Sequence, residues 1–400
     1  MKYVVLLGDG MSDEPIEELG GKTPLEHAET PNMDRLAREG ECGLAHTVAE
    51  GFHPGSDVAN LSVFGYDPAL CYSGRSPLEA ASMGIELAPE DVAFRLNLVT
   101  LTPNYGKLYM DDFSAGHITT EEANELVNCL QNELGGDEFN FYPGVSYRHL
   151  MVWKNGRDKL EFVPPHDISD QPIDGHLPKG DGADELISLM TSAQMLFSQH
   201  PVNTSRESER KLPANSIWLW GHGRAPRMEP MTERFGISGG AVISAVDLIK
   251  GIGIYAGLEV INVPGATGYI DTNYKGKADA ALEALKQGDF VYLHVEAPDE
   301  AAHSGSLEDK LQAIESFDRD VVGRVLDGLP ALGDFRVVVL PDHPTPVERK
   351  THTADPVPFA MFSSDGSISG SSRSYSESEA AASGLVVNPG HLLMSRLIGR

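Results

Sequence analysis

Residues 3–9 read Tyr-Val-Val-Leu-Leu-Gly-Asp, a short apolar run that ends in a carboxylate. A run of this kind, rich in aliphatic side chains and closed by glycine, is typical of a strand buried in a parallel sheet. Similar runs occur at Ser216–Leu219, Val260–Val263, Phe290–Val295 and Arg336–Leu340. Their recurrence predicts a largely parallel sheet.

Stretches with helical patterning lie between these strands. They are Ala28–Glu39, Glu121–Leu134, Ala183–Gln199, Ala241–Gly251, Lys277–Lys286 and Leu307–Asp327. Strands that alternate with helices are typical of α/β proteins, in which helices cover both faces of the sheet. We therefore predict an α/β fold with a mostly parallel sheet flanked by helices.

The length and texture of the chain indicate two domains. A chain of 400 residues exceeds what one hydrophobic core usually organises. Residues 91–234 carry few strand-end Asp and His residues and include a Pro- and Gly-rich stretch, Val163–Gly182. We predict that residues 91–234 form an inserted, smaller α+β domain, and that residues 1–90 and 235–400 together form a discontinuous main domain.

The chain is strongly acidic, with 59 Asp and Glu against 31 Lys and Arg and a formal net charge of −28. Such a field repels nucleic acid and anionic membrane surfaces, so we expect neither as a partner. A small anionic substrate is compatible with it, because bound metal cations would make a cleft locally positive. The composition leaves the oligomeric state open.

We expect the protein to be cytoplasmic. The first strand-like run follows Met1-Lys2 directly and is too short for a signal peptide. No apolar run is long enough to span a bilayer. Cys42, Cys71 and Cys129 are spaced like neither a disulfide framework nor a zinc knuckle, which fits a reducing compartment.

Potential ligands follow the predicted strands. They are Asp9 after the first strand, Asp299 and His303 after Phe290–Val295, Asp342, His343 and then His352 after Arg336–Leu340, and Ser56 in a Gly-rich turn before Val58–Phe64. The carboxyl ends of parallel strands border one crevice, so we expect these side chains to meet there. Carboxylate and imidazole groups suit Mn²⁺, Zn²⁺ or Mg²⁺.

Each part of this set also has an ordinary structural explanation. Asp299 and His303, four residues apart, would share a helix face and could be a plain i,i+4 pair. Asp342 and His343 could form a polar turn, and Ser56 could cap a helix. Together, however, seven such ligands suffice for two cations, which can clamp the oxygens of phosphoryl transfer and activate a serine nucleophile.

Four segments carry a specific resemblance. They are Leu7-Gly8-Asp9-Gly10-Met11, Pro54-Gly55-Ser56-Asp57-Val58-Ala59-Asn60-Leu61-Ser62, His294-Val295-Glu296-Ala297-Pro298-Asp299-Glu300-Ala301-Ala302-His303, and Pro341-Asp342-His343-Pro344-Thr345-Pro346 followed by His352. They resemble the alkaline-phosphatase superfamily and, more narrowly, the cofactor-independent phosphoglycerate mutases of archaeal type. The resemblance implies an alkaline-phosphatase-like main domain and two bound divalent ions, with Mn²⁺ expected and Zn²⁺ or Mg²⁺ as alternatives. It places one ion on Asp299, His303 and His352, and the other on Asp9, Asp342, His343 and the nucleophile Ser56.

The resemblance also gives the inserted domain a role. The insert is expected to close over the metal-binding domain and to bring basic residues to a small phosphorylated substrate. His117 matches a catalytic histidine near the phosphoserine, and Arg148 matches a substrate-binding arginine. Arg224 and Arg227 resemble an Arg-x-x-Arg pair suited to bidentate contacts with carboxylate or phosphate. Lys277 is a further candidate, and a surface salt bridge or a core histidine is the ordinary alternative for all of these residues.

Two positions depart from the archaeal pattern. Trp220 stands where an arginine is expected, and Pro344 replaces a more usual serine. These variants resemble a bacterial branch sometimes labelled a proposed homoserine kinase. No Walker-type Gly-x-x-x-x-Gly-Lys-Ser/Thr loop is present, so a nucleotide-dependent kinase would need another ATP site.

The leading hypothesis is a phosphoglycerate mutase of glycolysis. It would interconvert 3-phosphoglycerate and 2-phosphoglycerate through a phosphoserine on Ser56, with His117 as proton shuttle. One alternative keeps the same chemistry in a phosphohydrolase, or in a phosphotransferase that acts on a small hydroxy amino acid. The other is a metal-binding protein without turnover, against which the intact Ser56 argues.

Overall fold

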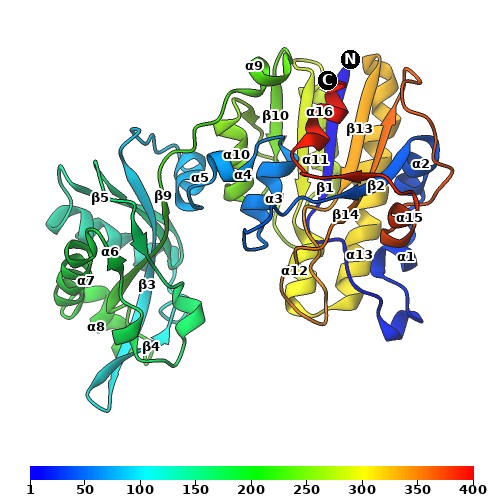
Figure 1. The fold of residues 1–400 in the computed structure, drawn as a ribbon. Helices are drawn as coiled ribbons and strands as arrows, with labels where there is room; N and C mark the ends of the chain where they lie inside the picture. The colour runs from blue at the N-terminus through cyan, green and yellow to red at the C-terminus, as the bar shows by residue number, and fades with distance from the viewer. The chain divides into compact units, whose positions relative to one another are not determined.

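The computed structural model describes residues 1–400, which divide into two compact units. Unit 1 comprises Met1–Tyr72 and Arg227–Arg400, and unit 2 comprises Ser73–Pro226 (Figure 1). The sequence suggests later boundaries, at 90/91 and 234/235. Helix α5 (Ser76–Ser82) accounts for part of this difference, because it packs on strands β3 (Val92–Asn104) and β9 (Ser216–Gly223) of unit 2.

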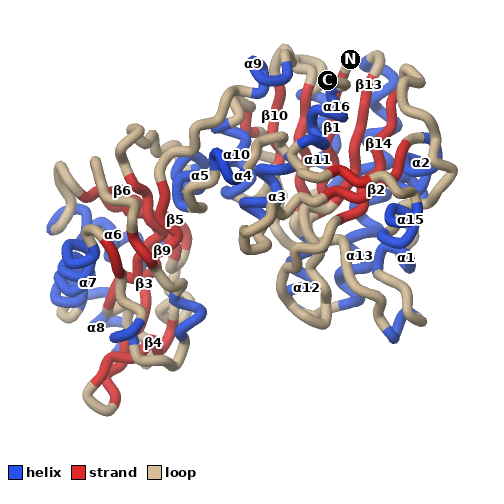
Figure 2. Tube along the Cα trace, viewed as in Figure 1, coloured by secondary structure: helices blue, strands red, loops and turns tan.

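Unit 1 is built on an eight-stranded sheet (Figure 2). Across the sheet the order is β11 (Glu259–Val260), β10 (Gly240–Ile243), β12 (Phe290–Val295), β1 (Lys2–Gly8), β13 (Phe335–Leu340), β14 (Val357–Ser363), β2 (Glu41–Ala45) and β15 (Val386–Val387). Only β14 runs antiparallel to its neighbours. The predicted α/β fold with a mostly parallel sheet is confirmed.

Helices cover both faces of this sheet. They are α1 (Pro24–His27), α2 (Pro31–Glu39), α3 (Ser56–Val63), α4 (Pro68–Cys71), α9 (Met231–Phe235), α10 (Asp247–Tyr255), α11 (Tyr274–Ala284), α12 (Ala297–Ser304), α13 (Leu307–Phe317), α14 (Arg324–Gly328), α15 (Glu377–Ala382) and α16 (Leu392–Ile398). Val4 and Leu6 of β1 lie in one buried cluster with Ala281 of α11 and Phe317 of α13. Alternation along the strand turns the intervening Val5, which is also fully buried, to the opposite face.

Two sequence predictions in unit 1 need correction. The helix predicted at Ala241–Gly251 is wrong in its first part, which forms β10 and pairs with β12 before α10 begins. A short, fully buried apolar run fits a strand as well as a helix, so its pattern does not discriminate. The strand predicted at Val260–Val263 pairs only over β11, at the edge of the sheet.

The helix predicted at Leu307–Asp327 is interrupted by a π-helical segment, Asp318–Gly323. This segment has a partner in α2. The carboxylate of Asp318 accepts the backbone N–H groups of Asn32 and Met33, at 3.2 and 2.7 Å. Thr30, which occupies the N-cap position of α2, makes no capping hydrogen bond. A side chain from the π segment therefore satisfies the free donors at the start of α2.

Unit 2 is an α+β unit. Its sheet has the order β4 (Lys107–Asp112), β3, β6 (Arg148–Trp153) and β5 (Phe139–Val145), and β9 pairs with β3 as well. A two-stranded sheet, β7 (Leu160–Glu161) and β8 (Lys179–Gly180), lies apart from it. Helices α6 (Thr120–Glu133), α7 (Ala183–Phe197) and α8 (Pro201–Ser208) complete the unit. Across the whole chain, no helix combines the length and apolar character that crossing a bilayer requires.

Candidate active site

Three adjacent strands deliver the candidate ligands to one edge of the sheet in unit 1. β12, β1 and β13 are parallel neighbours, with Gly8 paired to Val295 and Leu7 paired to Leu340. The chain therefore leaves all three strands at the same level, and Asp9 follows β1 directly. This is the crevice at the carboxyl ends of parallel strands in which α/β proteins bind ligands.

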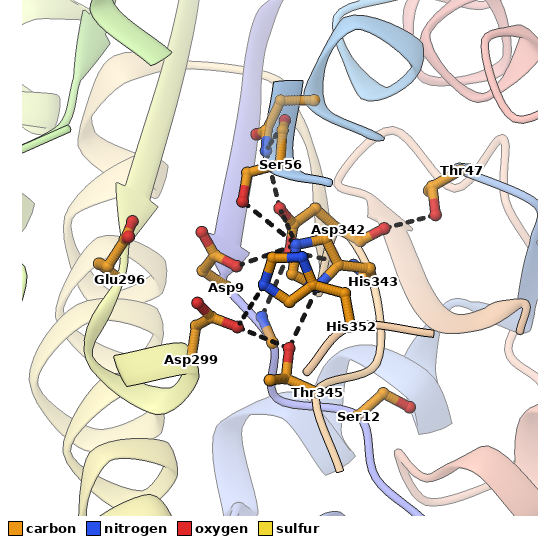
Figure 3. Close-up of polar contacts among 12 residues, drawn as sticks. Asp9, Ser12, Thr47, Ser56, Glu296, Asp299, Asp342, His343, Thr345 and His352 are labelled. Atoms are coloured by element: carbon orange, nitrogen blue, oxygen red, sulfur yellow. Dashed lines mark hydrogen bonds and ion pairs between the residues drawn. The ribbon is translucent and has the colours of Figure 1, made fainter. Parts of the chain in front are cut away.

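Ser56, Asp9, Asp342 and His343 converge at this edge (Figure 3). Ser56 Oγ lies 3.2 Å from His343 Nε2. The same nitrogen is 3.7 Å from Asp9 Oδ1 and 3.4 Å from Asp342 Oδ2. Asp9, Asp342 and His343 are completely buried. Four side chains from three separate segments thus surround one small volume.

A second group lies beside the first. Asp299 and His303 occupy one face of α12, and His303 Nε2 is 3.2 Å from Asp299 Oδ2. His352 Nε2 lies 3.5 Å from Asp299 Oδ1 and 2.9 Å from His303 Nε2. The ring of His352 stacks on that of His343, with centroids 3.9 Å apart, so the two groups are contiguous.

Hydrogen bonds at the outer nitrogens orient two of these imidazoles. His303 Nδ1 lies 3.0 Å from the backbone oxygen of Lys350, a pure acceptor, so Nδ1 carries the proton. The hydroxyl of Thr345 donates to Asp299 Oδ1 at 2.5 Å and lies 3.2 Å from His343 Nδ1, which donates to it. Both rings therefore direct Nε2 inward, and loss of a proton from that nitrogen on cation binding would leave its lone pair facing the cation, as in metal-binding histidines.

The donor set fits divalent cations. One ligand atom each from Asp9, Asp342 and His343 lie within 4.8 Å of one another, and so do those from Asp299, His343 and His352. Asp9 Oδ1 is buried without a hydrogen-bond partner, which is costly unless a cation satisfies it. Buried carboxylates and neutral imidazoles are suitable ligands for Mn²⁺ or Zn²⁺. His343 borders both groups, whereas the resemblance assigns it to one ion only.

The charges of the site are strongly coupled. Burial, followed by the negative charges of Asp342 and Asp299, raises the pKa of Asp9 well above its usual value. Burial acts in the same direction on Asp299, but hydrogen bonds from His303 and His352 outweigh it and hold the pKa of Asp299 well below its usual value. The hydrogen bond to Asp299 raises the pKa of His303 to about 9. Protons thus compensate the negative charge, and a bound cation would displace them.

Ser56 is the first residue of α3, and Gly55 occupies the N-cap position without a side-chain capping bond. The capping role considered for Ser56 is therefore wrong. Its hydroxyl is directed to His343 instead, and its backbone oxygen accepts a hydrogen bond from Asn60 Nδ2 at 2.8 Å. A serine at the start of a helix also has the helix N-terminus beside it, which favours phosphate.

Several residues that support the site are absent from the set predicted from the sequence. Asn60 Nδ2 also donates to Asp342 Oδ2 at 2.8 Å, and Tyr292 donates to Asn60 Oδ1 at 2.6 Å. His294 Nε2 lies 2.9 Å from Asp9 Oδ2. Burial lowers the pKa of His294 to about 3, so its ring is neutral. The sequence contains a signal for His294. Tyr292 and His294 are the two residues with polar side-chain groups in the buried run Phe290–Val295.

The predicted catalytic residue His117 and the predicted substrate-binding residue Arg148 belong to unit 2 and are exposed. Ala115, Gly116 and His117 have φ angles of 49°, 62° and 50°, three consecutive left-handed residues. This conformation costs energy for residues with a Cβ and tends to occur at functional sites. The guanidinium of Arg148 lies over the ring of Tyr147, 5.7 Å from its centroid, and Tyr147 also contacts the ring of His117.

The remaining basic candidates have other surroundings. Arg224 pairs with Asp158 at 2.8 Å and with Glu90 at 3.3 Å within unit 2. Arg227 is exposed at the start of the second segment of unit 1. Lys277 is fully buried, and its ammonium donates to the backbone oxygen of His294 at 3.1 Å. Burial lowers the pKa of Lys277 to about 8. This position favours a structural role at the end of β12.

Trp220, which stands in place of an expected arginine, packs against another arginine of unit 2. The guanidinium of Arg95 lies 4.6 Å from the centre of the Trp220 ring and pairs with Glu79 at 3.1 Å. Arg95 and Trp220 face each other across the β3–β9 ladder. The indole therefore supports an arginine that comes from the neighbouring strand.

Comparison with known proteins gives close relatives over the whole chain. A family model described as 2,3-bisphosphoglycerate-independent phosphoglycerate mutase matches residues 37–203. A Geobacter sulfurreducens protein named as a probable 2,3-bisphosphoglycerate-independent phosphoglycerate mutase is 62% identical over 400 residues and covers 100% of both chains. A Methanosarcina acetivorans protein named as the same mutase is 57% identical over 367 residues, 91% of each chain.

Solved structures agree with these relatives. A Pyrococcus horikoshii protein has a TM-score of 0.83 at 32% identity, over 100% of this chain and 97% of its own. The cofactor-independent phosphoglycerate mutase of Thermoplasma acidophilum has a TM-score of 0.70 at 26% identity, over 100% of this chain and 99% of its own. On this evidence the chain belongs to the 2,3-bisphosphoglycerate-independent phosphoglycerate mutase family.

Proposed function

We propose that this enzyme is a metal-dependent phosphoglycerate mutase that interconverts 3-phosphoglycerate and 2-phosphoglycerate through a phosphoserine at Ser56. The observation that carries the proposal is the position of Ser56 Oγ, 3.2 Å from His343 Nε2, a nitrogen that itself lies 3.7 and 3.4 Å from the buried carboxylates of Asp9 and Asp342. A serine that only caps a helix does not need an imidazole and buried carboxylates nearby, whereas a serine that attacks phosphorus does.

The ligands fall into two groups that meet at His343. We propose that Asp299, His303 and His352 hold one cation and that Asp9, Asp342, His343 and Ser56 hold the other, with Mn²⁺ in first place and Zn²⁺ or Mg²⁺ as alternatives. Two such cations, when bound, supply the positive charge that lowers the pKa of the serine hydroxyl and stabilises the phosphoryl group during transfer.

The residues of the chain then carry the reaction in two halves. Ser56 Oγ loses its proton and attacks the substrate phosphorus, the bond from phosphorus to the glycerate oxygen breaks, and a proton is delivered to that oxygen. The glycerate reorients, its other hydroxyl loses a proton and attacks the phosphorus of the phosphoserine. The bond from phosphorus to Ser56 Oγ breaks, and Oγ regains a proton. In the proposal, His117 of unit 2 gives and takes these protons, because it is an exposed histidine on a strained turn.

Arg148 is the proposed ligand of the substrate carboxylate or phosphate. Its guanidinium is exposed and lies over Tyr147, and its planar fork matches either anion. Arg224 and Arg227 remain weaker proposals, because Arg224 already has two carboxylate partners. A cytoplasmic location fits a small phosphorylated substrate and three free cysteines.

The test is a reaction of Mn²⁺-loaded protein with 3-phosphoglycerate, without added 2,3-bisphosphoglycerate, followed by phosphorus NMR. The proposal expects the 2-phosphoglycerate signal to grow to equilibrium without release of inorganic phosphate. Quantitative release of phosphate would instead identify a phosphohydrolase. Transfer from ATP to homoserine, with no conversion of phosphoglycerate, would identify the phosphotransferase alternative.

A matched pair of serines in α3 controls this test. Ser56→Ala removes the nucleophile and should abolish conversion. Ser62 lies in the same helix, and its buried hydroxyl donates to the backbone oxygen of Val58 at 3.3 Å. Ser62→Ala should retain activity within a few-fold. Full activity in Ser56→Ala would contradict the proposal.

A further inference from the structure

We propose that His294 is a positioning residue that fixes the rotation of the Asp9 carboxylate toward its cation, and that Ser244 fixes the orientation of His294. Neither residue belongs to the proposed ligand set or to the predicted substrate contacts. The inference rests on the proposed two-metal site, and it adds a control element behind that site.

The geometry forms a chain of hydrogen bonds from Asp9 through His294 to Ser244, and Glu296 Oε2 lies beside this chain, 3.8 Å from His294 Nε2. Asp9 Oδ2 lies 2.9 Å from His294 Nε2, and His294 Nδ1 lies 3.1 Å from Ser244 Oγ. Ser244 Oγ in turn accepts the backbone N–H of Val246 at 2.9 Å, at the N-cap of α10. Asp9 and His294 are completely buried, and Ser244 is 4% exposed. Solvent therefore has no part in orienting these groups.

The order of protons along this chain follows from the chemistry of its ends. A carboxylate that binds a cation is ionised and only accepts hydrogen bonds, so His294 Nε2 carries a proton and donates it to Asp9 Oδ2. A neutral imidazole has a single N–H, which leaves Nδ1 as an acceptor. Ser244 then donates its hydroxyl proton to Nδ1, while its oxygen accepts from Val246. The donor and the acceptor of each hydrogen bond are thereby assigned, and the tautomer of His294 is determined.

The consequence falls on the other oxygen of Asp9. With Oδ2 held by His294, Oδ1 is directed at His343 Nε2, 3.7 Å away, and has no hydrogen-bond partner. Without His294 the carboxylate could rotate about its Cβ–Cγ bond and present either oxygen or both. Outer-shell partners of this kind change metal affinity by about 10–100-fold when they are removed.

The strand end is held in place as well. The buried ammonium of Lys277 donates to the backbone oxygen of His294 at 3.1 Å. A histidine that merely filled the core would need partners for its two nitrogens, but those partners would have no reason to include a candidate metal ligand. A structural role and a positioning role for His294 therefore differ in one measurable way. Only the positioning role predicts that His294 changes the affinity for one of the two cations.

Two substitutions of His294 separate these roles. The amide nitrogen of His294→Gln reaches the place of Nε2 and can donate to Asp9, whereas the shorter His294→Asn reaches only the place of Nδ1. Both variants carry the same buried amide, so each controls for the other in stability. Metal-stripped full-length protein is titrated with Mn²⁺, free Mn²⁺ is measured by electron paramagnetic resonance, and thermal unfolding of the stripped proteins is recorded.

The proposal expects two Mn²⁺ per wild-type chain. In His294→Asn, one ion should bind about 10–100-fold more weakly while the other keeps its affinity. In His294→Gln both affinities should stay within a few-fold of wild type. Ser244→Ala should weaken the same ion as His294→Asn but less strongly, and Ser244→Thr, which retains the hydroxyl, should restore it.

Four outcomes would overturn the inference. One is equal loss of affinity in His294→Asn and His294→Gln, which would show a structural role only. Another is unchanged affinity for both ions in His294→Asn. A third is three ions in the wild type and two in His294→Asn, which would make His294 a ligand together with Asp9 and Glu296, whose donor atoms also lie within 4.8 Å of one another. A wild-type chain that binds no ion would contradict the proposed function itself, and so remove the basis of the inference.

Discussion

The hydroxyl of Thr345 donates a 2.5 Å hydrogen bond to Asp299 Oδ1 and accepts one from His343 Nδ1 at 3.2 Å. A single side chain thus connects the two groups of candidate ligands. Gly10 makes this approach possible, because a Cβ there would lie 2.5 Å from Asp299 Oδ1 and 2.6 Å from Thr345 Oγ1. Its φ of 60° also suits glycine.

Thr345→Val should therefore impair both groups at once. The substitution retains the shape of the side chain but leaves the His343 N–H without an acceptor and removes a donor from Asp299. We expect kcat/KM to fall by about 10–100-fold and Mn²⁺ affinity to fall with it. Thr345→Ser is the control and should retain most activity. Equal kcat/KM in the two variants would rule out the role of the hydroxyl.

Arg206 holds the strained turn that carries His117. Its guanidinium is buried and donates to the backbone oxygen of Ala115 at 2.6 Å, and it also pairs with Glu122. Arg206→Lys cannot make both contacts, so the turn should relax from its left-handed conformation. We expect kcat to fall by about tenfold or more with a smaller change in KM, because small displacements of a catalytic group are costly.

The control for this prediction is Arg210→Lys. Arg210 is exposed and follows α8, so its replacement should leave kcat unchanged. A kcat for Arg206→Lys equal to that of the control would contradict a positioning role for Arg206.

Removal of metal should destabilise unit 1 in particular. Without cations, the buried carboxylates of Asp9, Asp299 and Asp342 face one another, and binding of ions to the folded state alone adds about 2.7 kcal/mol at 100 times the dissociation constant. All three tryptophans, Trp153, Trp218 and Trp220, lie in unit 2. Calorimetry with and without a chelator should show a lower unfolding temperature, which Mn²⁺ restores, while the tryptophan fluorescence transition shifts less. No change in either transition would contradict a metal site in unit 1.

His149 should make unit 2 sensitive to acid. Burial lowers the pKa of His149 to about 4, against about 6.5 in an unfolded chain. Between these values the unfolded state binds more protons than the folded state, so the free energy of unfolding rises with pH over this window. The contribution of His149 to stability is lost on acidification. The free energy of unfolding is lower by roughly 3 kcal/mol once the pH has fallen below 4.

The test compares wild type with His149→Asn from pH 7 to pH 4, using denaturant unfolding followed by tryptophan fluorescence. The amide oxygen of asparagine can accept the hydrogen bond that Gly144 N–H now makes to His149 Nδ1 at 2.9 Å. The variant should lose stability less steeply as the pH falls. Parallel curves for the two proteins would show that His149 does not contribute to the acid sensitivity.

Much of the fold and of the site could be predicted because both depend on local pattern. Buried strands such as Phe290–Val295 are recognisable as apolar runs, and the polar residue that follows each run lies at the crevice for topological reasons. The spacing of Asp299 and His303 also predicts a shared helix face without knowledge of the rest of the chain.

The supporting residues could not be found in this way. Asn60 contacts Asp342 across 282 positions of sequence, and His294 contacts Asp9 across 285. Such partners are chosen by tertiary packing. A polar residue in a buried run, such as His294, indicates that it has a partner, but the sequence does not say which residue that is. The strand β10 was missed for a different reason, since Ala241-Val242-Ile243 is buried on both sides and has no alternation to read.

The most direct test of the central claim is the chemical state of Ser56 during turnover. Mn²⁺-loaded enzyme is mixed with phosphorus-labelled 3-phosphoglycerate, quenched in acid within milliseconds to seconds, digested and analysed by mass spectrometry. The account predicts label on the peptide that contains Ser56, at a level that rises and falls with substrate, and no label in Ser56→Ala. Turnover in the wild type with label on another residue, or on none at any time, would contradict the account.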